Sequence, residues 1–227
     1  MKIVTKAYQS NEEKHIFTEG INYFSIPNKS IWGMGDRDTL KILSKIKLNG
    51  KWLNLAAGDG RYNSYLLKNA ESVTTNDIDE SALSKLWFTT PEEYKNRLKT
   101  KVFDITHKFP FSNKTFDGIF CTGTLHLFSE PILKKIFHEI KRVLKNNGTI
   151  IIDFATDVKR KLPDGSLKIK KNEIGYHMDQ AINLITKLLN GYRIKKYIGS
   201  VPKELIKVGK IEYIFSCKYI LVIAKRM

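Results

Sequence analysis

The chain has 227 residues, of which 42% are hydrophobic, so it can build one sizeable core. No run approaches the roughly 18 apolar residues of a membrane-spanning helix, and the first residues lack the apolar core and cleavage site of a secretory signal, so we expect neither a membrane span nor export. The formal net charge is +16, and residues 158–227 hold 16 Lys and Arg against five Asp and Glu. This balance allows a nucleic-acid partner, but because lysine dominates over arginine it fits a lysine-rich surface better.

Short apolar runs alternate with helix-period segments from residue 40 to 154, which predicts βαβ units around a parallel sheet. In chain order we expect a helix over 39–46, a strand over 51–56, a helix over 61–70, a strand over 72–77, a helix near 80–87, and strands over 100–105 and 116–123. Residues 129–148 predict a long amphipathic helix, with Ser129 as its cap and Gly148 as its end. The strand 149–155 follows and is apolar on both faces.

The pattern changes beyond this strand. Residues 158–171 place a Pro-Asp-Gly turn between alternating segments, which predicts a hairpin within an insertion at 158–178. The remaining expected elements are a helix over 178–190 and strands over 192–199 and 217–226. No helical period separates these two strands, so we expect them to pair antiparallel at one side of the sheet.

Four very small residues stand at the end of the first strand, inside KWLNLAAGDGRYNSYLL: Ala56, Ala57, Gly58 and Gly60. In an open parallel sheet, ligands bind outside the carboxyl ends of the strands, and a turn without large side chains lets a ligand approach the backbone. The following helix offers free N–H groups and a positive dipole end, which suits a carboxylate or a phosphate. The third glycine of the dinucleotide-binding pattern G-x-G-x-x-G is missing, which disfavours a nicotinamide oxidoreductase.

Two carboxylates follow the next two strands. Asp77 ends the second strand and could accept hydrogen bonds from ribose hydroxyls, while Ile78 could pack on a base; Asp79 is better explained as the N-cap of the next helix. Asp104 ends the third strand and could accept from an adenine amino group. Because the carboxyl ends of parallel strands meet at one edge, we expect Asp77, Asp104 and the small-residue turn to form one site.

Several ordered motifs over about residues 39–155 resemble the class I S-adenosylmethionine-dependent methyltransferases, in the group related to quinone and small-molecule methylases. The similar stretches are LNLAAGDGRY, NDIDESAL, VFDITHKFPFSNKTFDGIFCTGTLHLF and EIKRVLKNNGTIIID. The resemblance implies an α/β fold: a Rossmann-like, seven-stranded, mostly parallel sheet with an antiparallel last strand and helices on both faces. It also implies a domain over 39–227, preceded by an N-terminal cap segment over 1–38 in which Trp32 could fold over the cofactor or pack as a buried residue.

The resemblance implies S-adenosylmethionine as the cofactor, and no metal. The residues expected to bind it are Asn54, Ala56, Ala57, Gly58, Gly60, Arg61, Asp77, Ile78, Asp104, Ile105, Thr122 and Gly123. Two of these depart from the family pattern. Asn54 replaces an acid that helps to hold the methionine ammonium, and Ala56 replaces the first glycine, where alanine allows close approach if its φ angle is negative.

The loop CTGTLHLFSEP, residues 121–131, lies where the acceptor and the methyl group should meet. Methyl transfer is an in-line displacement that depends mainly on positioning, and a base is needed only for a protonated acceptor. His126 is the candidate base or acceptor-orienting group, or else a partly buried residue that orders the loop. We expect Cys121 to pack in the core and Asp153 to have a structural role. Cys121 and Cys217 form neither a metal-ligand spacing nor a disulfide framework, so we expect a cytoplasmic location.

The acceptor is left open by these patterns. Methylation of a small molecule is the preferred hypothesis. An RNA acceptor, tRNA or rRNA, would use the basic C-terminal third, although the stretch Thr122–Leu125 lacks the N-P-P-Y/F loop expected for base amino groups. A non-catalytic module that binds the cofactor or a partner is a third hypothesis, suggested by Asn54. The sequence predicts no oligomeric state.

Overall fold

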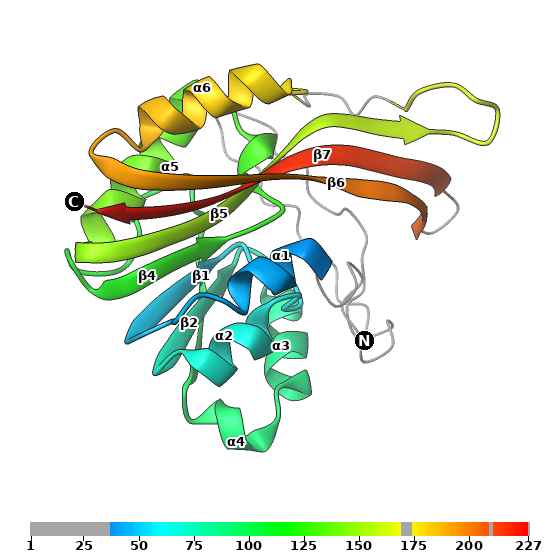
Figure 1. Cartoon of the computed structure of the whole chain (residues 1–227). Helices are drawn as coiled ribbons and strands as arrows, with labels where there is room; N and C mark the ends of the chain where they lie inside the picture. The colour runs from blue at the N-terminus through cyan, green and yellow to red at the C-terminus, as the bar shows by residue number, and fades with distance from the viewer. Residues whose placement is uncertain (1–36, 169–173, 209–210, 227) are drawn as a thin grey trace.

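The computed structural model describes residues 37–168, 174–208 and 211–226 (Figure 1). Most of the expected N-terminal cap segment, Trp32 included, lies outside the described residues, so the division into a cap and a domain stays a prediction. The helices are α1 (Arg37–Leu43), α2 (Asn63–Asn69), α3 (Glu80–Thr89), α4 (Glu92–Lys95), α5 (Glu130–Val143) and α6 (Met178–Leu188), with a short 3-10 helix η2 (Leu125–Leu127). The strands are β1 (Lys51–Leu55), β2 (Ser72–Asp77), β3 (Leu98–Val102), β4 (Phe116–Cys121), β5 (Leu144–Lys161), β6 (Tyr192–Val208) and β7 (Ile211–Arg226).

The strands form one seven-stranded sheet in the order β3-β2-β1-β4-β5-β7-β6. The five strands from β3 to β5 pair in parallel, and β7 runs antiparallel to both of its neighbours, β5 and β6. This topology confirms the expected fold class, including the antiparallel last strand. The order changes direction at β1 and β4, so the carboxyl ends of these central strands border the crevice where ligands bind in open α/β sheets.

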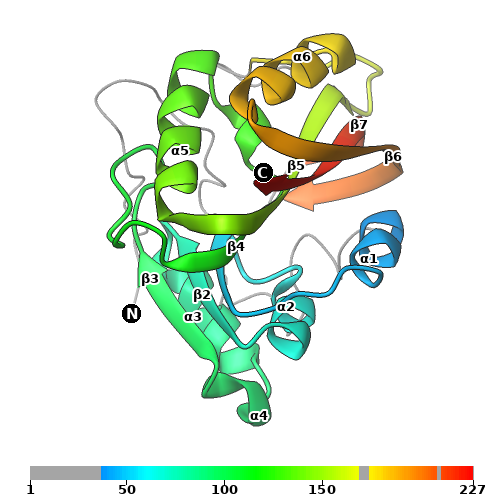
Figure 2. The ribbon, with the colours of Figure 1, turned by 60° about the vertical axis from the view of Figure 1, so that its left-hand side comes forward.

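Helices cover both faces of the sheet, as Figure 2 shows with α5 and α6 on one side and α1 and α2 on the other. One core cluster joins the sheet to α5 and α6, with Leu133, Ile136 and Ile185 among its buried members. The second joins the sheet to α1, α2 and α3 through residues such as Leu66 and Leu86. Each fully buried aliphatic side chain contributes roughly 1.5–3 kcal/mol, so these two layers fix the strand ends that carry the site.

The end of α5 differs from the prediction. The helix stops at Val143, and β5 begins at once with Leu144, which pairs with Phe116 of β4. Gly148 therefore lies inside β5 and does not end a helix, because pairing with β4 overrides the local helical preference of the segment. Ser129 occupies the N-cap position as expected, but its side chain makes no cap hydrogen bond.

The strands β5, β6 and β7 are much longer than their sequence patterns predicted. They form a ribbon that extends away from the rest of the sheet (Figure 1). Since β5 runs parallel to β4, its extension beyond Phe154 leaves from the carboxyl edge of the sheet. Beyond Lys161 the chain turns back, with Leu162 and Ser166 joined by a backbone hydrogen bond and a bridge from Lys161 to Leu167. The described part of the chain contains no helix both long and apolar enough to cross a membrane.

Candidate cofactor-binding site

The structure brings Asp77 and the small-residue turn together at the carboxyl edge of the sheet. The amide nitrogen of Gly58 donates to Asp77 Oδ2 at 2.7 Å, and the amide of Asp79 donates to Oδ1 at 3.0 Å. Each carboxylate oxygen keeps a second lone pair, so Asp77 is fixed in orientation and can still accept hydrogen bonds from a diol. Burial raises the pKa of Asp77, and the two backbone N–H groups partly oppose this shift. Asp79 caps α3 as expected, since its side chain accepts from the amide of Ser81.

The turn after β1 takes left-handed backbone angles at three positions. The φ angles are +48° at Ala56, +56° at Gly58 and +96° at Gly60. A Cβ at Gly58 would meet no atom within 4 Å, so the backbone there borders open space. A Cβ at Gly60 would lie 2.9 Å from Leu86 Cδ1, so this glycine permits close packing of α3.

Ala56 differs from its expected conformation. The sequence predicts close approach of a ligand only if the φ angle of Ala56 is negative, but the observed angle is positive. This left-handed region costs an L-residue roughly 1–2 kcal/mol. Two hydrogen bonds to Asn76 stabilise this strained backbone conformation. The amide of Ala56 donates to Asn76 Oδ1 at 3.3 Å, and the amide of Ala57 donates to the Asn76 carbonyl at 2.9 Å.

Asn76 is a site residue that the sequence reasoning missed. Its side chain is fully buried and also donates to the carbonyls of Lys101 at 3.1 Å and Phe103 at 2.8 Å. One side chain thus joins the turn after β1 to the segment after β3. The available signal was an amide in a strand whose neighbours are Thr and Val, directly before Asp77, since a buried polar group needs partners.

Asp104 lies two residues beyond the end of β3 rather than on the strand. Its Oδ1 accepts from the amide and the hydroxyl of Thr106, both at 2.8 Å. Its Oδ2 is buried, accepts no hydrogen bond, and lies 3.3 Å from His107 Nδ1. Because a buried carboxylate oxygen without a hydrogen bond is unfavourable, this atom suits a donor such as an adenine amino group.

A buried ion pair between Asp59 and Lys85 stabilises the turn after β1. Asp59 Oδ2 lies 3.0 Å from Lys85 Nζ of α3, and the two side chains are 0% and 6% exposed. The pair connects the centre of the turn to α3. Because both side chains are buried, removing either charge should be strongly destabilising.

The remaining predicted cofactor residues lie at different depths. Asn54 is buried within β1, between Thr75 of β2 and Phe120 of β4. Ile105 is a buried member of the core beside α5. Arg61 and Ile78 are half-buried near the turn and Asp77.

The loop after β4 lies at the same edge of the sheet. The amide of Gly123 donates to Asp153 Oδ1 at 2.6 Å, so Asp153 holds this loop in place. Gly123 has a φ of +71°, and a Cβ there would meet no atom within 4 Å. Thr122 is half-buried beside it. His126 follows on η2, half-buried, with its ring edge-on to Phe154 at 6.3 Å between centroids.

Cys121 is fully buried at the end of β4 and packs in the core, as expected. Burial and the nearby Asp153 and Asp77 charges raise the pKa of its thiol far above the ordinary range. A thiol that stays protonated is a poor nucleophile. Over the described residues, no group of three or more His, Cys, Asp or Glu side chains is arranged to hold a metal ion.

Known proteins resemble this chain over the segment that carries the site. Residues 53–152 match a family described as a methyltransferase domain. The segment from β1 into β5 thus corresponds to a methyltransferase domain. The matched residues of this methyltransferase domain run from β1 into β5 and include the turn, Asp77, Asp104 and the loop that carries His126.

Individual relatives cover different shares of the chain. A tRNA U34 carboxymethyltransferase from Nautilia profundicola is 33% identical over 103 residues, which are 44% of this chain and 33% of that protein. The chain thus aligns with about a third of the length of that relative. Two solved structures share the fold. A SAM-dependent methyltransferase from Aquifex aeolicus is 23% identical with a TM-score of 0.53, covering 81% of this chain and 89% of its own. The DhpI–SAH complex is 15% identical with a TM-score of 0.57, covering 82% and 81%.

Proposed function

We propose that this methyltransferase domain binds S-adenosylmethionine along the edge formed by the turn after β1, Asp77 and Asp104. Asp77 would accept from the ribose hydroxyls and Asp104 Oδ2 from the adenine amino group. The backbone of residues 56–60 would border the amino-acid part of the cofactor. The observation that carries this proposal is the 2.7 Å bond from the Gly58 amide to Asp77, which joins the turn and the carboxylate in one rigid unit.

The bound cofactor supplies an electrophilic methyl group, and the residues of this chain position the acceptor. The loop 122–128 would form the acceptor side, with its backbone held by Asp153. His126 would orient the acceptor or take its proton, which is the role that a half-buried imidazole can fill near neutral pH. We propose a small molecule as the acceptor, since the stretch Thr122–Leu125 lacks the N-P-P-Y/F loop expected for base amino groups.

A second candidate function is methylation of tRNA. Two observations favour it: the Nautilia profundicola relative is named as a tRNA-modifying enzyme, and the last 70 residues of this chain carry a large excess of Lys and Arg. The name describes a protein of which only a third aligns with this chain, so the acceptor class is left to experiment.

Calorimetry with S-adenosylhomocysteine tests the cofactor proposal. Asp77→Asn should weaken binding by at least about tenfold, because a neutral amide accepts less strongly from two hydroxyls than a carboxylate does. Asp179→Asn is the matched control, because this substitution removes the same charge from an exposed position on α6. Equal affinity of the two variants would contradict the proposal.

Transfer of a radiolabelled methyl group to a deproteinised extract, divided into RNA and small-molecule fractions, tests the acceptor. Label in the small-molecule fraction supports the first proposal, and label in the tRNA supports the second. Tight binding of S-adenosylhomocysteine without transfer to either fraction would instead indicate a non-catalytic module.

A further inference from the structure

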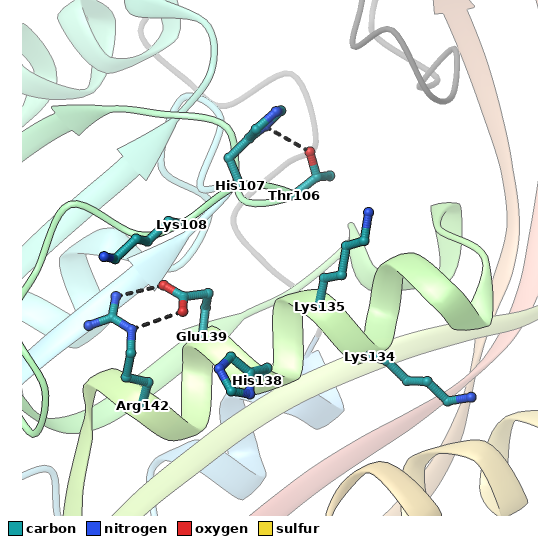
Figure 3. Close-up of a pocket in the computed structure, with 8 residues that line it drawn as sticks. All are labelled: Thr106, His107, Lys108, Lys134, Lys135, His138, Glu139 and Arg142. Atoms are coloured by element: carbon teal, nitrogen blue, oxygen red, sulfur yellow. Dashed lines mark hydrogen bonds and ion pairs between the residues drawn. The ribbon is translucent and has the colours of Figure 1, made fainter.

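The turn after β3 carries a histidine that the proposed cofactor site does not use. His107 Nδ1 lies 3.2 Å from Thr106 Oγ1 and 3.3 Å from Asp104 Oδ2, the atom proposed to accept from the adenine amino group. Figure 3 shows the imidazole and the Thr106 hydroxyl joined on this turn, across a depression from α5. The imidazole is thus a direct neighbour of the adenine end of the site.

The hydroxyl of Thr106 determines which nitrogen of the imidazole carries a proton. A hydroxyl has one proton, and Thr106 donates it to Asp104 Oδ1 at 2.8 Å, because a carboxylate can only accept. The Thr106 oxygen is therefore an acceptor toward His107, which makes Nδ1 the donor. Asp104 Oδ2, the second atom near Nδ1, is also an acceptor. Both neighbours thus assign the proton to Nδ1.

The Nδ1–H group is held only weakly in this position. Its distances to the two oxygens lie at or beyond the long end of the range for N–H···O hydrogen bonds, and Asp104 Oδ2 accepts no hydrogen bond from any residue that the structure describes. The imidazole is 61% exposed, whereas the Asp104 side chain is 8% exposed. The adjoining depression, about 700 Å³ in volume, gives the ring room to turn. The donor can therefore move to a better acceptor while the carboxylate stays fixed.

A donor and an acceptor side by side are complementary to an edge of adenine. The amino group of adenine donates, and the ring nitrogens N1 and N7 on either side of it accept. Hypoxanthine and guanine carry a carbonyl oxygen in place of this amino group, so they would set an acceptor against Asp104. A pair of contacts also discriminates more strongly than one contact, because a wrong base leaves more polar groups unpaired.

We infer that His107 determines the base specificity of the site together with Asp104. When the cofactor binds, Asp104 Oδ2 accepts from the adenine amino group, and His107 Nδ1–H turns to donate to the ring nitrogen beside that group. The inference rests on the proposed cofactor site and adds a second base-reading side chain to it. Thr106 holds Asp104 through Oδ1, which leaves Oδ2 and the imidazole donor to the ligand.

Calorimetry on the full chain tests this inference with three probes. They are S-adenosylhomocysteine and its 1-deaza and 7-deaza analogues, each of which lacks one of the two ring nitrogens beside the amino group. His107→Leu removes the donor, and His107→Asn keeps an N–H group at the place of Nδ1. His138→Leu is the matched control, because it removes another exposed imidazole that borders the same depression.

For S-adenosylhomocysteine, we expect His107→Leu to weaken binding about fivefold, which is the effect of one lost hydrogen bond. His107→Asn and His138→Leu should stay within about twofold of the native protein. With one of the two deaza analogues, the native protein and His107→Leu should bind equally, because the acceptor that His107 contacts is missing. That analogue identifies the ring nitrogen.

Equal affinity of the native protein and His107→Leu for S-adenosylhomocysteine would overturn the inference. A loss that persists with both deaza analogues, or one that His107→Asn shares in full, would overturn it as well, because a merely structural role gives that result. The proposed function fails differently: Asp77→Asn would then bind S-adenosylhomocysteine as tightly as the native protein, and the cofactor site and this inference would fall together.

Discussion

The backbone amide of Gly58 and the carboxylate of Asp77 are joined by a 2.7 Å hydrogen bond, although 19 residues separate them in the chain. The bond fixes the turn after β1 against the end of β2. It also means that the protonation state of one side chain affects both the turn and the proposed ribose contact. The first prediction follows from this relationship.

Affinity for S-adenosylhomocysteine should fall as the pH is lowered, beginning above the ordinary range of an aspartate. Burial raises the pKa of Asp77, so this carboxylate takes up a proton earlier than an exposed one and then loses acceptor capacity. Calorimetry between pH 5 and 8 measures this dependence, and Asp77→Asn should bind weakly with no such slope. An identical slope in both proteins would show that Asp77 is not the titrating contact.

The raised pKa of Asp77 has the opposite effect on the stability of the ligand-free protein, which should decrease as the pH rises. A raised pKa in the folded state gives a stabilising contribution below the ordinary pKa of aspartate, and this contribution is lost as the pH rises through the raised value. Asp77→Asn should lack that loss. Urea unfolding of both proteins across this pH range measures the difference, and a native protein that gains stability relative to the variant on raising the pH would contradict it.

Ala56→Gly should stabilise the protein by about 1 kcal/mol. The φ of +48° is unfavourable for alanine and natural for glycine, and this relief exceeds the extra freedom that glycine gives to the unfolded chain. Ala57→Gly is the control, because Ala57 does not have a positive φ and the change should destabilise by roughly 0.5–1 kcal/mol. Chemical denaturation compares them; a loss of stability in both variants would show that Ala56 is not strained.

Lys85→Met should destabilise the protein by roughly 3–5 kcal/mol, because it removes the ammonium group that lies 3.0 Å from the buried carboxylate of Asp59. Adding Asp59→Asn to this variant should recover much of the loss, since no uncompensated charge then remains. Urea unfolding of the two single variants and the double variant completes the cycle. If the two single effects simply add, the pair is not coupled as its 3.0 Å separation implies.

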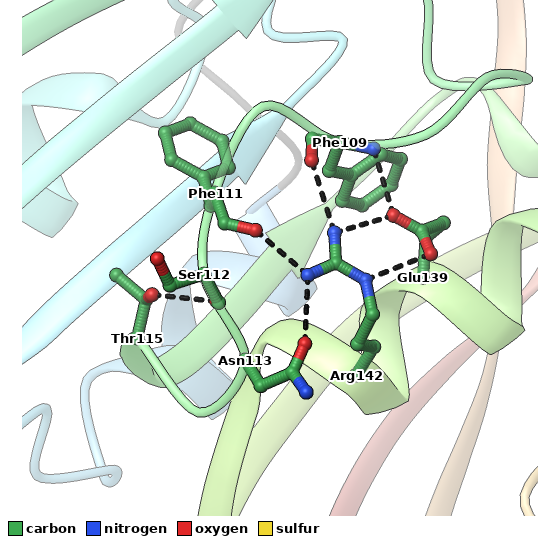
Figure 4. A network of polar contacts seen from close by, with 7 residues as sticks. All are labelled: Phe109, Phe111, Ser112, Asn113, Thr115, Glu139 and Arg142. Atoms are coloured by element: carbon green, nitrogen blue, oxygen red, sulfur yellow. Dashed lines mark hydrogen bonds and ion pairs between the residues drawn. The ribbon is translucent and has the colours of Figure 1, made fainter.

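Arg142→Lys should destabilise the chain segment after β3 by roughly 1–2 kcal/mol. The Arg142 guanidinium binds Glu139 at both oxygens and donates to the carbonyls of Phe109 and Phe111 and to Asn113 Oδ1, a set that one ammonium cannot replace (Figure 4). Thermal unfolding measures the loss, and hydrogen exchange over residues 105–113 locates it. Unchanged protection there would contradict the prediction.

Arg142 and the amide of Phe109 lower the pKa of Glu139. A lowered pKa gives stability that is present above the ordinary pKa of glutamate and is lost as the pH falls through the lowered value. Glu139→Gln should therefore lack part of the acid-side loss of stability. Unfolding between pH 3 and 7 tests this, and matching profiles for the native protein and the variant would be contrary to it.

The sequence predicted the order of the seven strands and of the longer helices, because the apolar period of each is clear, but it missed the short helices α4 and η2. It failed where pairing decides the structure. The segment from Leu144 to Gly148 has helical character but lies in β5 beside β4. The strands β5, β6 and β7 extend far beyond their apolar cores because β7 pairs along its length with both β5 and β6.

The candidate site also has features that the sequence predicted and features that it did not. The position of Asp77 at the end of β2 could be predicted, because the strand pattern before it ends there. The positive φ of Ala56 and the contacts of Asn76 could not, since both depend on three strand ends meeting in space. The pair of Asp59 and Lys85 was equally hidden, because its members are 26 residues apart and Lys85 lies outside the motifs.

A crystal structure of the protein with S-adenosylhomocysteine tests the central claim most directly. We predict the ribose hydroxyls within hydrogen-bonding distance of Asp77, the adenine amino group at Asp104 Oδ2, and the amino-acid part along the backbone of residues 56–60. A nucleoside bound elsewhere, or one that contacts neither carboxylate, would contradict the account.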